Sequence, residues 1–404
     1  MRPTRIMLIA GEASGDMLAA ELVHALRPAL AELQSRPTAD LQPLHASLAP
    51  EFFGAGGPAM AAAGVDLAFD LTAHSVIGLA DVLKNYSEFK RLFEQLVELA
   101  VSRQPDVIIC VDFSGFNRRL AHAIKHRVRA QQGPFHNWNP KIIQYISPQV
   151  WASRPGRARQ MQDDLDLLLS IFPFEKDWYA ARVPELPVKF IGHPIIDRYA
   201  GAPAAARHGA NASRAPLLVL LPGSRRAELK RHLPVMLEAW RNIQKARPET
   251  RALMVFSSEN LARIARSLIG TPPGLEMQVG ALAEALSGAT AAIAASGTVT
   301  MECACFGVPS VVLYKTNWST YEIVRRIIRV KYIAMPNLLA GEEIFPEFIQ
   351  AAATPENITR ATLELLNDEG RRTRVKTRLA EIIASLGGPG ANTRAARAVV
   401  ELLR

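Results

Sequence analysis

The sequence is poor in cysteine and has no apolar run long enough to cross a membrane. Only three of its 404 residues are cysteines, Cys110, Cys303 and Cys305, which is too few for a disulfide framework and favours a reducing compartment. Cys303 and Cys305 form C-x-C without a second Cys or His pair nearby, so we expect both to pack as small apolar residues in a helix. Glu12 interrupts the first apolar run too early for a signal peptide. The longest runs, such as residues 216–222, are far shorter than the roughly 20 residues of a membrane span, and we expect a cytoplasmic protein that is soluble or peripheral.

Two nucleotide-binding fingerprints are also absent. No G-x-G-x-x-G follows the first predicted strand, which disfavours a nicotinamide dehydrogenase. No G-x-x-x-x-G-K-[ST] occurs anywhere, which excludes a P-loop. No D-x-D motif follows a predicted strand, so we expect neither a metal ion nor another cofactor.

The bulk composition fits a globular chain of two domains. Apolar residues make up 49% of the chain and charged residues 21%, and 404 residues suit two domains of about 200 each. The net charge of +9 favours an anionic partner: nucleic acid, anionic lipid or a phosphorylated substrate. A charge that only keeps the protein soluble is the alternative.

Short apolar runs alternate with longer amphipathic stretches along the whole chain. Strands that alternate with helices and are apolar throughout predict parallel sheets covered on both faces. The Ala-, Gly- and Pro-rich residues 199–215 predict a linker, and residues 35–50 a loop insertion. The predicted strands are 5–10, 52–54, 106–112, 142–147, 165–172, 188–192, 217–221, 252–256, 291–295 and 309–314, and the clearest helices are 17–33, 87–102 and 117–130.

We therefore predict an α/β fold with two Rossmann-like, doubly wound domains that face a cleft. The first domain comprises residues 1–197 and the second residues 198–389. A closing helix at 390–404 is expected to return to the first domain. Ligands of such folds bind outside the carboxyl ends of the strands, so residues that directly follow strands are the candidates for function.

A Gly-rich turn, residues 11–16 (GEASGD), joins the first strand to its helix. Such a turn can bring backbone N–H groups to a ligand at the positive end of the helix, which makes Gly11, Ser14, Gly15 and Asp16 candidate binding residues. Alternatively, Ser14 caps the helix and Asp16 is a first-turn acid favoured by the helix dipole.

Asp112 ends a very apolar strand, and Asn117 lies in the turn and helix that follow it. A carboxylate at that position is expected to point into the cleft, where partial burial raises a carboxyl pKa and suits a general base for a hydroxyl proton. An Asp that caps the following helix is the alternative.

The second domain offers two candidate phosphate-binding turns. In residues 221–228 (LPGSRRAE), Gly223 allows close approach, Ser224 and backbone N–H groups donate, and Arg225 and Arg226 supply cations for a diphosphate. A capped helix with solvated arginines is the alternative.

The second turn, Ser296-Gly297-Thr298, opens a helix after the strand 291–295 and can hold a phosphate at the helix N-terminus. Glu302 lies four residues after Thr298 on the same helix face, where its carboxylate can accept hydrogen bonds from ribose hydroxyls. This arrangement is typical of nucleotide-sugar binding rather than nucleotide hydrolysis.

Three further segments are candidates for contact with a membrane surface, because basic and amphipathic helices are attracted to anionic headgroups. Solvated helix faces and an ordinary core-facing helix are the alternatives. The segments are Arg325, Arg326, Arg329 and Lys331; Arg118, Arg119, Lys125, Arg127 and Arg129; and the stretch 76–93.

Ten motifs, taken in order, resemble the lipid-A-disaccharide synthase family. Each motif alone is weak, but ten in register over nearly the whole chain are specific. They are GEASGD (11–16), FFGAGGPAMAAAG (52–64), VIG (76–78), PDVIICVDFSGFN (105–117), YISPQVWASR (145–154), FPFEKDWY (172–179), FIGHP (190–194), LLPGSRRAE (220–228), ASGTVTME (295–302) and MPNLLAG (335–341).

The resemblance implies an inverting glycosyltransferase with a GT-B fold. Members of the family condense UDP-2,3-diacylglucosamine with 2,3-diacylglucosamine 1-phosphate (lipid X), and form the β-1′,6-linked lipid A disaccharide 1-phosphate and UDP. They are peripheral proteins at the cytoplasmic face of the anionic inner membrane of Gram-negative bacteria. The resemblance makes a homodimer plausible, and nucleic acid is not an expected partner.

Carried over by position, the resemblance implies that Asp112 is the base and that Arg225 lies at the UDP diphosphate. It implies nucleotide contacts for Ser296, Gly297, Thr298 and Glu302, and it places Asn337 in the matching loop 335–341. Many members have a second Asp three residues after the base, where this chain has Gly115, so Asp112 is expected to act alone.

Two rival functions compete with this interpretation. One is another GT-B enzyme that uses UDP-N-acetylglucosamine, such as a 2-epimerase or a transferase acting on the peptidoglycan precursor. Such an enzyme would have the same phosphate-binding turn followed by a ribose-binding glutamate as residues 296–302. A non-catalytic, basic membrane- or nucleic-acid-binding protein would not require two nucleotide-type helix starts.

Overall fold

The computed structural model describes residues 2–35, 49–74, 86–200 and 215–404. Three sequence predictions therefore fall largely outside the described residues. They are the loop insertion at 35–50, the linker at 199–215, and the VIG motif with the first part of the stretch 76–93.

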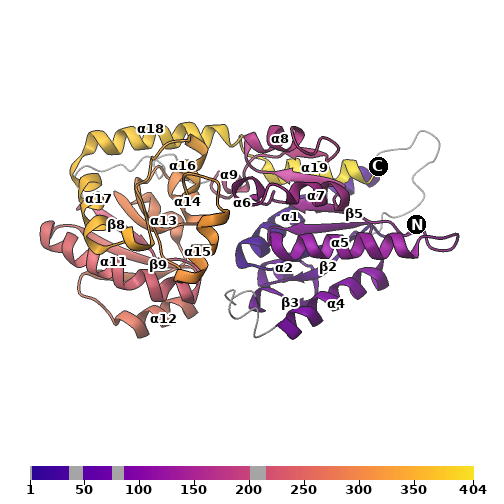
Figure 1. Cartoon of the computed structure of the whole chain (residues 1–404), viewed down its shortest axis with the longest axis horizontal. Coiled ribbons are helices and arrows are strands. Elements are labelled where there is room, and N and C mark those ends of the chain that lie inside the picture. Colours follow the sequence, from indigo (N-terminus) through magenta and orange to yellow (C-terminus); the bar gives the residue numbers. More distant parts are fainter. Residues whose placement is uncertain (1, 36–48, 75–85, 201–214) are drawn as a thin grey trace. The chain divides into compact units, whose positions relative to one another are not determined.

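The chain divides into two compact units (Figure 1). Unit 1 comprises Met1–Pro194 and Gly387–Arg404, and unit 2 comprises Ile195–Leu386. The closing helix α19 (Ala391–Leu402) belongs to unit 1 and packs beside α1 (Ala13–Ser35). The Tyr145 hydroxyl fastens it by donating to Asn392 Oδ1 over 2.7 Å.

Unit 1 is built on a seven-stranded parallel sheet with the order β3-β2-β1-β4-β5-β6-β7. Alternate residues of a strand face opposite sides, and in β1 every residue from Ile6 to Ala10 is buried, so helices cover both faces. Its elements are β1 (Arg5–Ala10), α1, β2 (Glu51–Gly56), α2 (Pro58–Ala62), β3 (Asp66–Asp70), α4 (Tyr86–Arg103), β4 (Val107–Val111), α5 (Ser114–Gln131), β5 (Lys141–Tyr145), α6 (Val150–Ser153), α7 (Arg157–Asp164), β6 (Leu167–Ser170), α8 (Pro173–Ala180), β7 (Val188–Phe190) and α19, with α9 (Pro194–Arg198) at the boundary of the units.

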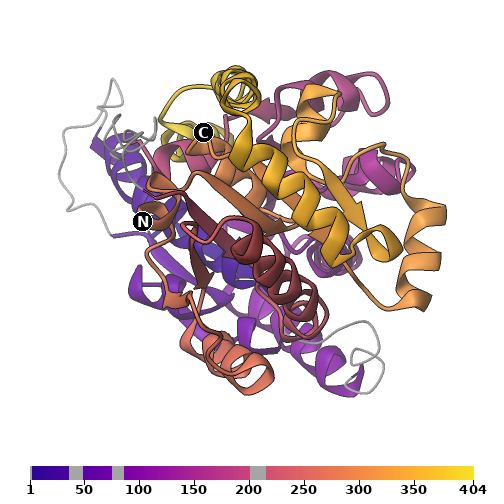
Figure 2. The same cartoon turned by 90° about the vertical axis from the view of Figure 1, so that its left-hand side faces the viewer.

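Unit 2 is built on a six-stranded parallel sheet with the order β10-β9-β8-β11-β12-β13. Leu218 and Leu220 belong to one core and Val219 and Leu221 to another, on the opposite face; helices lie over the near face in Figure 2. Its elements are β8 (Leu217–Leu221), α11 (Arg226–Ala246), β9 (Arg251–Phe256), α12 (Glu259–Ile269), β10 (Leu275–Val279), α13 (Leu282–Ser287), β11 (Ala291–Ala295), α14 (Val299–Cys305), β12 (Ser310–Tyr314), α15 (Trp318–Ile327), α16 (Met335–Ala340), β13 (Glu347–Ile349), α17 (Pro355–Asn367) and α18 (Glu369–Ser385).

The two parallel, helix-covered sheets confirm the predicted α/β class. Three strands were missed: β3, β10 and β13. All three are edge strands with exposed or half-buried residues, so they lack the continuous apolar run that marks a strand buried on both faces. Cys303 is buried in α14 and Cys305 packs half-buried against the same core, as predicted.

Each sheet has one topological switch point, where the strand order reverses direction. In unit 1 it lies between β1 and β4, and in unit 2 between β8 and β11. Ligands of open parallel sheets bind outside the carboxyl ends of the strands at such points. The turns that follow these four strands are therefore the candidate sites.

Candidate functional site

In unit 1 the turns after β1 and β4 touch each other. A Cβ on Gly11 would lie 2.2 Å from Cδ1 of the Phe113 ring, and a Cβ on Gly15 would lie 3.7 Å from Cβ of Asp112. A side chain at Gly11 is thus incompatible with the position of Phe113. The two motifs, distant in sequence, meet at the switch point.

The turn after β4 is strained at the residue that the sequence indicates as the base. Asp112 has φ 46° and Phe113 has φ 41°, and Ile146, just after the neighbouring strand β5, has φ 69°. Left-handed backbone is unfavourable for residues other than glycine, above all for a β-branched one. Such strain persists only where surrounding structure imposes it, and it clusters at functional sites.

Two buried amides hold this turn. Asn117 Nδ2 donates to the carbonyl oxygens of Val111 and Asp112 over 3.1 and 3.0 Å. Gln144 Nε2, from β5, donates to the carbonyls of Asp112 and Ile146 over 3.2 and 3.1 Å. Asn117 is 0% exposed, so it lies beneath the turn. Its contacts indicate that it positions Asp112.

Asp16 is likewise a structural residue. Its carboxylate is buried, and it accepts hydrogen bonds from the backbone N–H groups of Gly57, Ala59 and Met60 over 2.7, 2.9 and 3.1 Å. These groups are the start of α2, so Asp16 caps that neighbouring helix. Ser14 is the second residue of α1, so it does not cap that helix.

In unit 2 the turn after β8 presents its arginines on the surface. Gly223 has φ 116°, and Ser224, Arg225 and Arg226 are exposed. The carboxylate of Glu228 accepts the N–H groups of Ser224 and Arg225 over 3.0 and 3.2 Å. An acid at the third helical position thus reaches back to cap the turn, and the Ser224 hydroxyl and the two arginine side chains stay the predicted phosphate contacts.

A buried histidine braces the same turn. His232 Nδ1 lies 2.8 Å from the carbonyl oxygen of Pro222, and its Nε2 accepts the N–H of Lys315 over 3.1 Å. This pairing requires the neutral ring with its proton on Nδ1. Burial lowers the pKa of His232, which favours that neutral form.

The turn after β11 is open above its backbone. A Cβ on Gly297 would have no atom within 4 Å, and Gly297 and Thr298 are exposed. Ser296 Oγ donates to the carbonyl of Ile333 over 3.1 Å, which joins this turn to the loop before α16. Because β8 and β11 are adjacent strands, the two predicted phosphate-binding turns lie at one switch point.

Glu302 lies one helical turn below this opening, as predicted, and is held by Tyr199. The Tyr199 hydroxyl donates to Glu302 Oε1 over 2.8 Å, and the Tyr199 ring packs against Phe306 with 4.9 Å between centroids. Burial raises the pKa of Glu302, while the Tyr199 hydrogen bond opposes that rise.

Asn337 is buried and uses its whole amide inside the protein. Nδ2 donates to the Phe345 carbonyl and to Glu347 Oε1 over 2.7 and 2.8 Å, and Oδ1 accepts the N–H groups of Ile344 and Phe345 over 2.9 and 2.8 Å. These contacts give Asn337 a structural role in the loop 335–341. Glu347 also accepts the Ile333 N–H over 2.9 Å, so Asn337 and Glu347 together order the loop next to Ser296.

Sequence reasoning missed four residues that shape these turns. Two of them offer a signal in the sequence: Gln144 is a polar residue inside an apolar strand, and His232 is a polar residue on an apolar helix face. Tyr199 and Glu347 offer no such signal, because Tyr199 follows the end of α9 and Glu347 is the first residue of β13. The four are Gln144, Tyr199, His232 and Glu347.

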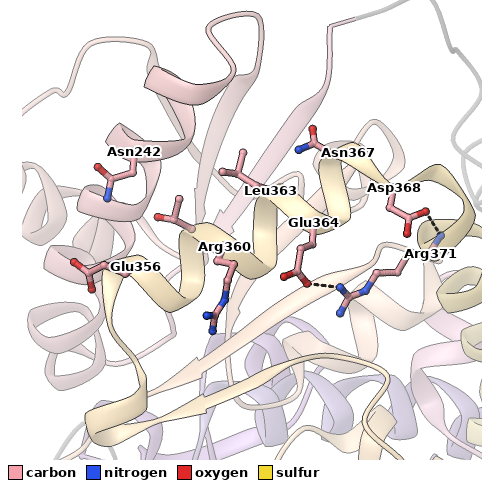
Figure 3. Close-up of a pocket in the computed structure, with 9 residues that line it drawn as sticks. Asn242, Glu356, Arg360, Leu363, Glu364, Asn367, Asp368 and Arg371 are labelled. Carbon is pink, nitrogen blue, oxygen red and sulfur yellow. Dashed lines mark hydrogen bonds and ion pairs between the residues drawn. The ribbon is translucent and has the colours of Figure 1, made fainter.

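A surface groove lies elsewhere in unit 2, along α11, α17 and the start of α18 (Figure 3). It has a volume of about 710 Å³ and contains none of the predicted site residues. Within it, Glu364 pairs with the Arg371 guanidinium, and Asp368 accepts the backbone N–H of Arg371 over 2.7 Å. Across the described ranges, no helix is long and apolar enough to cross a membrane.

Comparison with known proteins gives the same family over the full chain. A family model described as Lipid-A-disaccharide synthetase matches residues 6–401. The lipid-A-disaccharide synthase of Myxococcus xanthus is 36% identical, with 99% of this chain and 98% of that protein covered. The lipid-A-disaccharide synthase of Trichlorobacter lovleyi is 34% identical, with 100% and 98% covered.

Solved structures give the fold. The UDP-GlcNAc 2-epimerase from Neisseria meningitidis bound to UDP-GlcNAc has a TM-score of 0.54 at 11% identity, over 100% of this chain and 99% of that one. CalG4, the calicheamicin glycosyltransferase, has a TM-score of 0.54 at 14% identity, over 100% and 98%. These likenesses show that the fold is GT-B.

Proposed function

This chain belongs to the lipid-A-disaccharide synthetase family, and from that membership we propose that it transfers a diacylglucosaminyl group from UDP-2,3-diacylglucosamine to lipid X. It is a glycosyltransferase, as its relatives are. The observation that carries the proposal is the position of the family motifs. Four of them, at 11–16, 105–117, 220–228 and 295–302, form the turns at the switch point of each sheet, which is where parallel sheets bind ligands.

The proposed reaction is a single displacement with inversion. Unit 1 binds the acceptor, and the Asp112 carboxylate accepts the proton of the lipid X 6-hydroxyl as that oxygen attacks the anomeric carbon. The bond from that carbon to the UDP oxygen breaks. Unit 2 binds UDP, where Arg225, Arg226 and the exposed Gly297–Thr298 turn stabilise the charge that develops on the leaving group. Glu302 accepts hydrogen bonds from the ribose.

The substrates carry acyl chains, so the proposal places the protein at a membrane surface. We place it at the cytoplasmic face of the inner membrane as a peripheral protein. The exposed Trp318 and the exposed Arg325 and Arg326 of α15 support contact with anionic headgroups, since aromatic and basic side chains favour that interface. A homodimer stays a prediction of the resemblance.

The test is incubation of the purified protein with UDP-2,3-diacylglucosamine and lipid X in detergent, with mass detection of the disaccharide 1-phosphate. A parallel reaction with UDP-N-acetylglucosamine distinguishes a different GT-B activity. Asp112→Asn is expected to lower kcat by about 10²–10⁴-fold, and Asp66→Asn, at the exposed pair with Arg103, is the control. Absence of disaccharide from the wild-type reaction would overturn the function, and near-wild-type turnover of Asp112→Asn would overturn the base.

A further inference from the structure

The basic residues of α5 fall into two groups. Lys125 pairs with Asp166 and Arg127 with Glu98, each over 2.8 Å. Arg129 donates to the carbonyl of Asp163 over 3.1 Å. These three cations are already engaged within the protein. Arg118 and Arg119, at the start of the helix, belong to a different environment.

Arg118 and Arg119 are near two further arginines, Arg154 and Arg157, at the start of α7. Helices α5 and α7 pack together, and Arg118 donates to Gln160, one turn beyond Arg157. Burial lowers the pKa of Arg118, and the charges of Arg119 and Arg154 lower it further. Burial also lowers the pKa of Arg157, with contributions from Arg154, Arg118 and Arg119. We call these four residues the arginine cluster.

Among the described residues the arginine cluster is not neutralised by a direct ion pair, although the buried Asp164 lines the same cavity as Arg118. In the part of the chain that the structure describes, no ion pair joins any of its four members to an acid. The one acid whose charge favours Arg118 is Asp164, which is 2% exposed and contacts His122 Nδ1 over 3.0 Å. Mutually repelling cations without a direct ion pair make a site for an external anion, and guanidinium groups match the geometry of phosphate oxygens.

The cluster adjoins the turn that carries Asp112. Ser114, Arg118, Gln144 and Pro148 line one narrow cavity, and Gln144 donates to the Asp112 carbonyl over 3.2 Å. Arg118 lies four residues after Ser114, which is about 6 Å along the helix. A hexopyranose 1-phosphate carries its phosphate on C1 and its 6-hydroxyl on the methylene group attached to C5. These two ring carbons flank the ring oxygen, which gives a separation of similar size.

We propose that the arginine cluster binds the phosphate monoester of the acceptor and thereby directs its 6-hydroxyl toward Asp112. The identity of the acceptor rests on the proposed function. Arg118 and Arg157, the two half-buried members, provide the main contacts. Arg119 and Arg154, which are exposed, attract the dianion.

The test compares two acceptors, lipid X and the same diacylglucosamine without its 1-phosphate. Arg118→Gln and Arg157→Gln are each expected to raise KM for lipid X about tenfold, and the double variant more, because hydrogen bonds between charged groups are stronger than those between neutral groups. The kcat/KM for the phosphate-free acceptor stays within twofold of wild type. Arg118→Lys keeps the positive charge but loses the planar guanidinium that donates two parallel hydrogen bonds to a phosphate, so it gives an intermediate KM for lipid X. Arg127→Gln, on the same helix, is the control and leaves both acceptors unaffected.

The outcomes separate this proposal from the proposed function. Failure of the wild-type protein to form disaccharide from lipid X overturns the function itself. Wild-type product formation with unchanged KM for lipid X in the double variant overturns the arginine cluster alone, as does an equal loss with both acceptors. Vesicles containing phosphatidylglycerol test the other source of phosphate. The double variant is expected to sediment with them as wild type does, and loss of sedimentation with an unchanged KM for lipid X would assign the cluster to membrane headgroups.

Discussion

The side-chain amide of Asn117 donates a hydrogen bond of 3.0 Å to the main-chain carbonyl oxygen of Asp112. Gln144 donates to the same oxygen over 3.2 Å from the neighbouring strand. Two buried amides thus converge on one carbonyl in a left-handed turn. The position of the Asp112 carboxylate depends on this pair, because the turn is unfavourable without partners that hold it.

Replacing Asn117 by leucine is therefore expected to affect turnover and stability more than substrate affinity. The change removes a hydrogen-bond donor from the carbonyls of Val111 and Asp112. Each buried carbonyl left without a partner lowers the free energy of unfolding by about 1–3 kcal/mol, and the loss of the donor lets Asp112 move. We expect kcat to fall about ten- to hundredfold, the melting temperature to fall, and KM for both substrates to change less than threefold. Gln131→Leu, exposed at the end of α5, is the control. A large rise in KM with unchanged stability would show that Asn117 contacts a ligand.

The backbone positions of the site could be predicted from sequence, whereas their side-chain partners could not. Strands buried on both faces, such as β8 and β11, leave continuous apolar runs whose ends mark the turns. The contacts that hold those turns join residues far apart: Gln144 and Asp112 are 32 positions apart, His232 and Lys315 are 83, and Tyr199 and Glu302 are 103. Such contacts follow from tertiary packing, which local periodicity does not encode.

The same limit applies to the polar groups of two motifs. A Gly-Ser-Arg turn suggests phosphate donors, and in the fold Glu228, three residues after Arg225, accepts two of its N–H groups. Asp16 follows the first strand as a ligand-binding acid would, and in the fold α2 supplies three N–H groups to it. In both cases the motif predicts the position of a polar group but not its partners within the fold.

Tyr199→Phe is expected to weaken UDP binding and to reduce the part of the UDP affinity that depends on the ribose hydroxyls. The Tyr199 hydroxyl fixes the Glu302 carboxylate, and loss of that hydrogen bond is expected to raise Kd for UDP about three- to tenfold. Affinity for 2′,3′-dideoxy-UDP, which lacks the hydroxyls, should change little, so the discrimination between the two nucleotides shrinks. Calorimetric titration of both nucleotides measures this, with Tyr321→Phe as the control.

The pH dependence of UDP binding provides a second test of the hydrogen bond between Tyr199 and Glu302. The ionised form of Glu302 is the one that accepts two ribose hydroxyls, so UDP affinity falls as pH drops through the Glu302 pKa. Burial raises that pKa and the Tyr199 donor opposes the rise. In Tyr199→Phe the loss of affinity on acidification should therefore begin at a higher pH than in wild type. Identical pH profiles for the two proteins would separate Glu302 from ribose binding.

His232 is expected to make the stability of unit 2 sensitive to mild acid. Burial lowers the pKa of His232 below the ordinary value of about 6.5, so the unfolded chain takes up a proton at a pH where the folded chain does not. The contribution is fully present above about pH 6.5 and is lost as pH falls from there toward the folded pKa. Protonation also leaves the Lys315 N–H without its acceptor, a loss of about 1–3 kcal/mol for a buried group.

Urea unfolding at pH 7.5 and 5.5 measures this effect. His232→Gln keeps a donor and an acceptor but does not titrate, so the difference in unfolding free energy between the two pH values should be smaller than in wild type. His24→Gln, at an exposed position of α1, should keep the wild-type difference. An unchanged difference in His232→Gln would show that another group causes the acid sensitivity.

The family resemblance places a second Asp of many members at the position of Gly115, and the structure has room for an Asp side chain there. A Cβ there would have no atom within 4 Å, and Gly115 is the second residue of α5. Gly115→Asp should therefore be tolerated and raise stability by about 1 kcal/mol, because it removes glycine from a helix and adds a negative charge at the positive end.

If Asp112 is the only base, kcat of Gly115→Asp at pH 8 stays within threefold of wild type. The new charge also raises the pKa of Asp112, since like charges disfavour ionisation, so the acidic limb of the pH–rate profile moves to higher pH. Gly115→Asn shares the helical gain without the charge and should leave the profile in place. A tenfold or greater gain in kcat for Gly115→Asp but not for Gly115→Asn would mean that a second carboxylate takes part in proton transfer, and the single-base mechanism would be wrong.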